Sequence, residues 1–211
     1  MESLNYSISM AGTAAFAITA VLAVAPRGID LFGVCVLGIV TAIGGGTLRD
    51  VILNVPVFWA ADMNYIWVAL AASVAAFLAQ SLFTRKEMFA LLLYIDGLAG
   101  ALFAIQAADK VLALQFGLPL APILLAIITA IGGGLIRDVL AGRQNLLMSR
   151  EIYAVPVLFG STLFVVAMAY IPQHRSLAGI SCVLAIFAFR AAAIHWHWCI
   201  PDCLSTGPKT D

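Results

Sequence analysis

Two Arg-Asp pairs, each placed shortly after three consecutive glycines, are the residues of this chain best suited to chemistry. The first pair belongs to TAIGGGTLRDVIL at residues 41–53, and the second belongs to TAIGGGLIRDVLA, which begins 88 residues later. Charged side chains inside apolar segments usually face a protein interior and mark substrate or ion pathways. The pattern therefore predicts two related charged sites. The predicted ion-pathway or gating residues are Gly44, Gly45, Gly46, Arg49, Asp50, Asp96, Gly132, Gly133, Gly134, Arg137 and Asp138.

The glycine triplets are expected to break the helices that contain them. A glycine in a helix interior costs about 1 kcal/mol relative to alanine, so three in a row favour a kink or an unwound turn. Backbone groups released in this way are tolerated at membrane depth only where they face protein or water. Their carbonyl oxygens could then replace part of a cation's hydration shell. The alternative is that the two arginines are ordinary anchors at span ends, with aspartates that pair locally.

Asp96, in the apolar stretch LLLYIDGLAG, is a third candidate. A lone carboxylate inside a span costs about 2.5 to 3.5 kcal/mol on insertion scales, so it should find water, a cation or an arginine. The alternative is that it lies in a hydrated mouth or caps broken backbone near Gly97. The small residues that follow it permit close helix packing in either case.

The tail HWHWCIPDC places four possible metal ligands within nine positions, namely His195, His197, Cys199 and Cys203. Histidine and cysteine are ligands that zinc prefers. The two histidines do not share a helix face, however, and the tryptophans between them suit a membrane interface. The sequence therefore predicts no metal and no bound cofactor. It also lacks a Ser/His/Asp set, paired catalytic carboxylates and an H-E-x-x-H motif, so an enzyme is not expected.

Composition indicates the class of protein that positions these residues. Of the 211 residues, 63% are hydrophobic and 10% are charged, and the mean hydropathy is +1.04. Soluble domains are about 45–50% apolar and about 25% charged. We therefore predict an all-α, polytopic membrane protein that forms a single transmembrane domain over residues 1–211. The formal net charge is zero and no run of like charges occurs, so nucleic acid is not an expected partner, whereas membrane lipids are.

Seven segments are long and apolar enough to cross the bilayer, which takes about 20 residues of helix. Proline, glycine and charged residues occupy the joints between them. The segments run approximately over residues 8–25, 31–53, 65–83, 89–108, 118–140, 153–171 and 177–195.

The duplication extends beyond the glycine triplets. The letters AG and FAI at residues 11–18 of the first span recur at residues 99–105 of the fourth, and Tyr65 corresponds to Tyr153. Because each repeat holds an odd number of spans, the second copy must enter the membrane from the opposite side. The sequence thus predicts two inverted three-helix repeats plus one extra helix. Repeat one covers about residues 8–83, repeat two about 89–171 and the seventh helix about 177–195, followed by a short C-terminal tail.

The distribution of basic residues predicts the orientation, because cytoplasmic loops carry an excess of Lys and Arg. The side of the N-terminus holds Arg49, Lys110 and Arg175. The opposite side holds Arg27, Arg85, Lys86, Arg137, Arg143, Arg150, Arg190 and Lys209. We therefore expect a multi-pass protein of the cell (inner) membrane with its N-terminus outside and its C-terminus in the cytoplasm.

The twin GGG-x-x-R-D motifs, the FAI letters of the first and fourth spans and the Tyr-led third and sixth spans resemble the TRIC family, the trimeric intracellular cation channels, in its prokaryotic branch. The resemblance covers the chain to about Trp198. It implies a homotrimer in which each subunit has its own pore for monovalent cations, chiefly potassium, with sodium as a further permeant ion. It also implies that the glycine-containing spans bend around the pore, beside the Arg-Asp pairs.

Inverted repeats with broken helices are equally a mark of secondary transporters. A carrier of a small solute such as glycine is therefore the alternative function, and relatives of this sequence carry that label. A carrier needs two alternately open states, whereas a channel needs one continuous path, and the sequence leaves this choice open.

Overall fold

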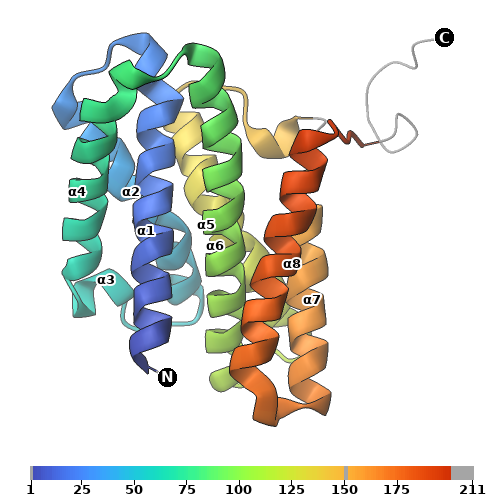
Figure 1. The fold of residues 1–211 in the computed structure, drawn as a ribbon. Coiled ribbons are helices and arrows are strands. Elements are labelled where there is room, and N and C mark those ends of the chain that lie inside the picture. Colours follow the sequence, from blue (N-terminus) through green and yellow to red (C-terminus); the bar gives the residue numbers. More distant parts are fainter. Residues whose placement is uncertain (1, 150–151, 201–211) are drawn as a thin grey trace.

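The computed structural model describes residues 2–149 and 152–200, and every regular element described there is a helix (Figure 1). The long helices are α1 (Glu2–Val24), α2 (Leu31–Ile52), α4 (Asn64–Ala79), α5 (Arg85–Ala113), α6 (Leu120–Leu140), α7 (Val155–Tyr170) and α8 (Arg175–His195). The short elements are α3 (Phe58–Ala61) and the 3₁₀ turns η1 (Ala25–Arg27), η2 (Gln80–Leu82), η3 (Leu146–Met148) and η4 (Pro172–His174).

The long helices match the seven predicted spans. Six of them are long and apolar enough to cross a membrane, α4 together with η2, and the seventh, α7, is apolar but has 16 residues. At 1.5 Å per residue, α7 is about 24 Å long, so it nearly spans about 30 Å of hydrocarbon. The predicted all-α fold of a polytopic membrane protein with seven helices is therefore confirmed.

Local signals in the sequence fix the starts of two central helices. The side chain of Asp30 accepts a hydrogen bond of 2.7 Å from the backbone N–H of Gly33, which caps α2. Thr84 and Glu87 form a reciprocal capping box at the start of α5. Such caps satisfy N–H groups that have no partner inside the helix. The cap places the start of α5 at Arg85, four residues before the predicted start of the fourth span.

Four helices, α1, α2, α5 and α6, form the centre of the molecule. Helix α1 packs against α2 and α5, and α6 packs against α2 and α5. Helix α4 covers α1 and α2 at one edge, while α7 and α8 cover α5 and α6 at the other (Figure 1). Phe16 of α1 stacks on Phe103 of α5 with ring centroids 5.6 Å apart, and buried alanines on both helices keep them close. The charged candidates therefore lie on the helices of this central group.

The glycine triplets are where α2 and α6 touch. A Cβ atom on Gly45 would clash with the carbonyl oxygen of Thr129, and a Cβ atom on Gly133 would clash with the carbonyl oxygen of Thr41. These contacts are reciprocal, because residues 45 and 41 lie 88 positions before residues 133 and 129. As 41 faces 133 and 45 faces 129, the two helices run in opposite directions where they meet.

Both helices continue through their triplets as uninterrupted α-helix. The unwound turn expected in the second and fifth spans is therefore contradicted, while the alternative expectation of a kink stays a prediction. The physical reason is that the lost side chains let two helix backbones approach to contact distance. Packing between backbones offsets the low helix propensity of glycine, and the helical hydrogen bonds remain.

Candidate functional site

The Arg-Asp motif forms the same local structure in both repeats. Nε of Arg49 donates to Oδ1 of Asp50 at 2.8 Å, and Nε of Arg137 donates to Oδ1 of Asp138 at 2.9 Å. The second oxygen of each aspartate accepts a backbone N–H eight residues later, from Phe58 at 3.0 Å and from Leu146 at 3.4 Å. These donors begin the short helices α3 and η3. Each aspartate thus anchors its arginine and the start of the following turn at once.

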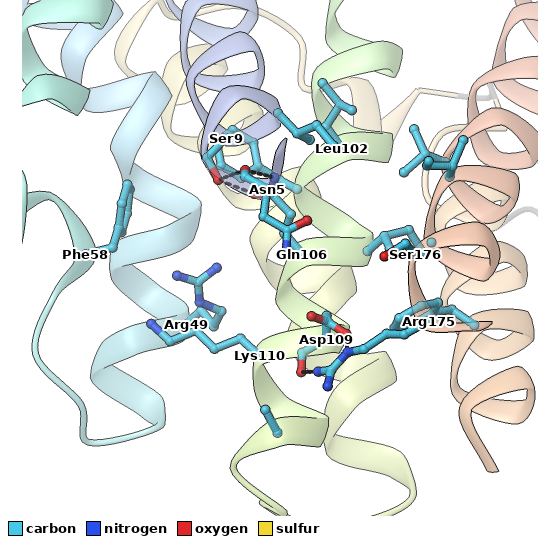
Figure 2. A pocket seen from close by; sticks show the side chains of 18 of the residues that line it. Asn5, Ser9, Arg49, Phe58, Leu102, Gln106, Asp109, Lys110, Arg175 and Ser176 are labelled. Atoms are coloured by element: carbon cyan, nitrogen blue, oxygen red, sulfur yellow. Dashed lines mark hydrogen bonds and ion pairs between the residues drawn. The ribbon is translucent and has the colours of Figure 1, made fainter. Parts of the chain in front are cut away.

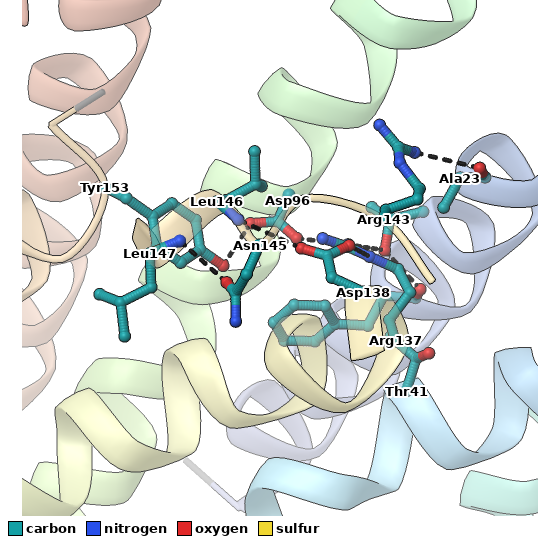
Figure 3. A network of polar contacts seen from close by, with 12 residues as sticks. Ala23, Thr41, Asp96, Arg137, Asp138, Arg143, Asn145, Leu146, Leu147 and Tyr153 are labelled. Atoms are coloured by element: carbon teal, nitrogen blue, oxygen red, sulfur yellow. Dashed lines mark hydrogen bonds and ion pairs between the residues drawn. The ribbon is translucent and has the colours of Figure 1, made fainter. Parts of the chain in front are cut away.

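The site of repeat two is a buried network of polar contacts (Figure 3). Arg137 is fully buried, and its Nη1 donates to Oδ1 of Asp96 at 2.6 Å and to Oγ1 of Thr19 at 2.8 Å. The hydroxyl of Tyr153 donates to Oδ2 of Asp96 at 2.8 Å. Residues of α1, α5 and α6 and the segment before α7 thus meet around one guanidinium group. With Asp138, two carboxylates face one cation, so this directly paired group has a net charge of −1.

The buried guanidinium group excludes one interpretation of the sequence. A snorkelling arginine keeps its charged head in water, but Arg137 is 0% exposed. Nη2 of Arg137 donates no hydrogen bond to any described residue, and the nearby cavity beside Asp96 and Tyr153 has a volume of only about 10 Å³. That volume is about the minimum that holds one water molecule. A hydrated ion therefore has no room in this cavity.

The site of repeat one has a different set of partners. Arg49 is 6% exposed and Asp50 is fully buried. Nζ of Lys110 lies 2.7 Å from Oδ1 of Asp50, the same oxygen that Arg49 binds. The guanidinium group of Arg49 also lies over the ring of Phe58, 5.8 Å from its centroid. Two cations here share one carboxylate, so the directly paired group has a net charge of +1.

A cavity of about 710 Å³ opens beside this first site (Figure 2). Its polar wall includes Asn5 and Ser9 of α1 and Gln106 of α5, and the hydroxyl of Ser9 donates to Oε1 of Gln106 at 3.0 Å. Its mouth holds Asp109, which accepts a hydrogen bond of 2.5 Å from Nε of Arg175. The remaining wall is apolar and comes mainly from α5 and α8. It comprises Ile8, Phe58, Leu102, Phe103, Ile105, Ala113, Phe164, Gly179, Ile180, Val183 and Leu184, with Tyr65 and Ser176 at its edge.

The structure brings some predicted site residues together and places others apart. Asp96 joins Arg137 and Asp138 in one network. An arginine was one of the three partners expected for Asp96. Arg49 and Asp50 form the second site at the other end of the helix core. Gly44, Gly45, Gly132 and Gly133 pack α2 against α6, whereas Gly46 lies against the ring of Phe58 and Gly134 lies against Tyr153 and Asp96. The described lining of the large cavity includes none of the six glycines.

Several contributors to the two sites were not singled out from the sequence. Lys110 was interpreted as a loop residue and Tyr153 only as the first residue of the sixth span, yet both bind a buried aspartate. Thr19 and Gln106 gave no signal, because a single polar residue in an apolar helix is common. One signal in the sequence could have found Lys110 and Arg175. The orientation count assigns both of them to the same side of the membrane as Arg49.

The proposed metal ligands of the tail lie only partly within the described residues. Trp196 stacks on Trp198 with centroids 5.8 Å apart, and the Cys199 thiol donates to the carbonyl oxygen of His197 at 3.5 Å. Among the described residues, no group of three or more possible ligands is placed to hold a metal ion. Cys203 lies outside the described residues, so the prediction that the tail binds no metal stays a prediction.

Comparisons with known proteins identify a matching family model and several bacterial relatives. A family model described as "Glycine transporter" matches residues 6–81 and again residues 93–169. A "UPF0126 membrane protein" of Vibrio cholerae is 39% identical over 94% of this chain and 82% of its own length. The "UPF0126 inner membrane protein YadS" of Escherichia coli is 35% identical over 94% of this chain and 95% of its own length.

Among solved structures, a similar one is the TRIC trimeric intracellular cation channel orthologue from Rhodobacter sphaeroides. It has a TM-score of 0.85 and 32% sequence identity over 93% of this chain and 100% of that chain.

Proposed function

We propose that this chain is a channel for monovalent cations, chiefly potassium. The chain belongs to the family whose model is described as a glycine transporter, and it also belongs with the TRIC channels among the solved structures. The observation that carries the proposal is a cavity of about 710 Å³ that reaches a buried Arg-Asp pair within one subunit. A second such pair lies at the other end of the same helices. Neither pair has the partners of a catalytic group, and we propose no enzymatic activity.

The two repeats are proposed to be inverted in the membrane. The reciprocal contacts of Gly45 with Thr129 and of Gly133 with Thr41 are those expected of a two-fold relation between α2 and α6. The family model matches the chain twice, once in each repeat. Such a relation puts Arg49 near one membrane surface and Arg137 near the other.

In this proposal the described conformation is closed at Arg137. A cation would enter the cavity beside Arg49 and pass between the repeats, where Asp50, Asp96 and Asp138 offset the charge of the arginines. Conduction would require the network around Arg137 to separate enough for an ion and its water. Arg137 and Asp96 are therefore proposed as gate residues.

The subunit is proposed to assemble with two further copies in a lipid bilayer, as the name of the Rhodobacter relative states for that protein. Because the cavity and both charged sites lie within one chain, each subunit would carry its own pore. The excess of basic residues away from the N-terminal side places the N-terminus outside and the C-terminus in the cytoplasm of the inner membrane.

Potassium efflux from liposomes tests the function. Purified protein is expected to release potassium down its gradient without ATP or a co-substrate, and Arg137→Gln is expected to change the rate because it removes the cation at the closed end. Arg85→Gln, an exposed residue on α5 outside both sites, is the matched control. Liposomes that hold folded trimers and release no potassium in any variant would refute the channel.

The alternative function is a carrier of a small solute such as glycine, and the description of the family model is the observation that favours it. A carrier exchanges solute across the membrane through alternating states, so it shows saturable counterflow. We expect no counterflow of labelled glycine in the liposomes that release potassium. Saturable glycine counterflow without potassium release would replace the channel by the carrier.

A further inference from the structure

The two Arg-Asp sites differ most at the position that faces the terminal nitrogens of the arginine. In repeat two, Nη1 of Arg137 binds the carboxylate of Asp96 at 2.6 Å. The residue that corresponds to Asp96 in repeat one, 88 positions earlier, is Ile8, which cannot accept a hydrogen bond. Ile8 lines the cavity of about 710 Å³. Where repeat two has a carboxylate, repeat one thus has an apolar side chain in the wall of a cavity.

Arg49 is built to present donors to that space. Its side chain is more than nine-tenths buried and lines the cavity, and its Nε is held by Asp50 at 2.8 Å. Figure 2 shows its two terminal nitrogens on the cavity side, pointing toward the end of α1 that carries Asn5 and Ser9. A guanidinium group offers its donors in a rigid fork that matches the two oxygens of a carboxylate.

Charge in the cavity favours an anion. All three basic residues that the sequence assigns to the side of the N-terminus, Arg49, Lys110 and Arg175, line this cavity. Asp109 is already paired with Arg175, and Asp50 is shared by Arg49 and Lys110. These five groups leave a net charge of +1 beside the apolar wall of α5 and α8. The side chain of Arg49 is itself more than nine-tenths buried, and a charge-assisted hydrogen bond to such a group is strong.

We propose that this cavity binds a small free carboxylate, of the size of acetate or glycine, on the guanidinium group of Arg49. The ligand takes the place at Arg49 that the side chain of Asp96 takes at Arg137. Asn5, Ser9 and Gln106 supply the neutral polar groups around it. A carboxylate is preferred over the phosphate of a lipid because the equivalent site in the same chain already contains one. The proposal concerns the same cavity as the proposed cation entrance, but its test is independent of cation conduction, since binding is measured without any flux.

Saturation-transfer NMR on the purified full-length protein in phosphatidylcholine nanodiscs tests the proposal. Acetate and glycine are each expected to give a signal, and methylammonium, which lacks the carboxylate, is expected to give none. Arg49→Gln should weaken acetate binding at least tenfold. Ile8→Asp should weaken it to a similar extent, because the new side chain supplies the carboxylate from within. Arg85→Gln makes the same charge change outside the cavity and should bind acetate as the wild type does.

Folding of each variant is checked by size-exclusion profile, and Arg49→Gln leaves Asp50 its partner Lys110. Undiminished acetate binding by folded Arg49→Gln would overturn the proposal, as would equal signals from methylammonium and acetate. Nanodiscs that contain phosphatidylglycerol separate the two sources of an anionic group. Acetate binding that persists there supports a free carboxylate, whereas its loss would assign the cavity to a lipid phosphate instead.

Discussion

The Arg137 site and the Arg49 site are formed by nearly identical stretches of 13 residues, yet their net charges are opposite. Both bind the neighbouring aspartate through Nε, and in both the aspartate holds the next short helix. Around Arg137 two carboxylates face one cation, whereas Arg49 and Lys110 share one carboxylate beside a cavity. The duplicated motif therefore fixes the geometry of each site. The partners from outside the motif, Asp96 at one site and Lys110 at the other, decide whether a site is closed or open.

Removal of the arginine should separate the two sites most strongly. Arg137→Met leaves Asp96 and Asp138 buried without their cation, and breaking a buried pair of this kind costs about 3–5 kcal/mol. Arg49→Met leaves Asp50 with Lys110 at 2.7 Å, so we expect about 1–2 kcal/mol. Reversible unfolding in mixed micelles measures both. Equal losses of stability would show that the two sites are energetically alike.

The glycine contact should respond equally in the two repeats. A methyl group on Gly45 or Gly133 meets the carbonyl oxygen of the facing helix, so either Gly→Ala change should cost about 1–3 kcal/mol by overpacking. Gly100→Ala is the control, because its Cβ would lie at an ordinary 3.7 Å from the carbonyl oxygen of Ala130. The measurement is the same unfolding midpoint. A neutral Gly45→Ala change would mean that α2 and α6 are not in backbone contact.

Asp96→Asn tests the charge of the closed site through ion selectivity. The change keeps the shape of the side chain but raises the local net charge from −1 to 0, which removes an attraction for cations. We expect the preference for potassium over chloride to fall by about tenfold, or about 1.4 kcal/mol. Reversal potentials in a potassium chloride gradient measure it, with Asp62→Asn, a half-buried residue outside both sites, as control. An unchanged reversal potential would place Asp96 outside the ion path.

Lys110→Gln should have the smallest effect. Its side chain is 33% exposed, so the loss of its ion pair should cost under about 1 kcal/mol of stability. The local net charge falls from +1 to 0, which should raise potassium conductance modestly at low salt and less at high salt. Lys86→Gln, an exposed residue at the start of α5, is the control. A conductance that falls in Lys110→Gln would contradict a cation barrier at this site.

The sequence was sufficient for the fold because the hydrophobic spans and the repeat are direct consequences of membrane thickness and duplication. It located Arg49, Asp50, Asp96, Arg137 and Asp138 because charge inside an apolar span is rare. It failed on the glycine triplets, since low helix propensity predicts a break when the partner of the helix is unknown. Only the contact with Thr129 and Thr41 explains why both helices continue.

The difference between the two sites was also out of reach of the motif. It depends on Asp96 and Lys110, which lie on α5 and reach the two arginines only after the helices pack. Tyr153 and Thr19 complete the closed site from two further parts of the chain. A sequence shows which residues are charged, but the pairing of these charges is a property of packing.

Water access along α1 tests the central claim, that the path is open to Arg49 and closed at Arg137. Ser9 lines the cavity and Thr19 binds Arg137, and their separation of ten positions places them about 15 Å apart along the helix. In a chain without other cysteines, a membrane-impermeant thiol reagent added from the N-terminal side should modify Ser9→Cys rapidly and leave Thr19→Cys unmodified. Modification of Thr19→Cys as fast as that of Ser9→Cys would contradict the account.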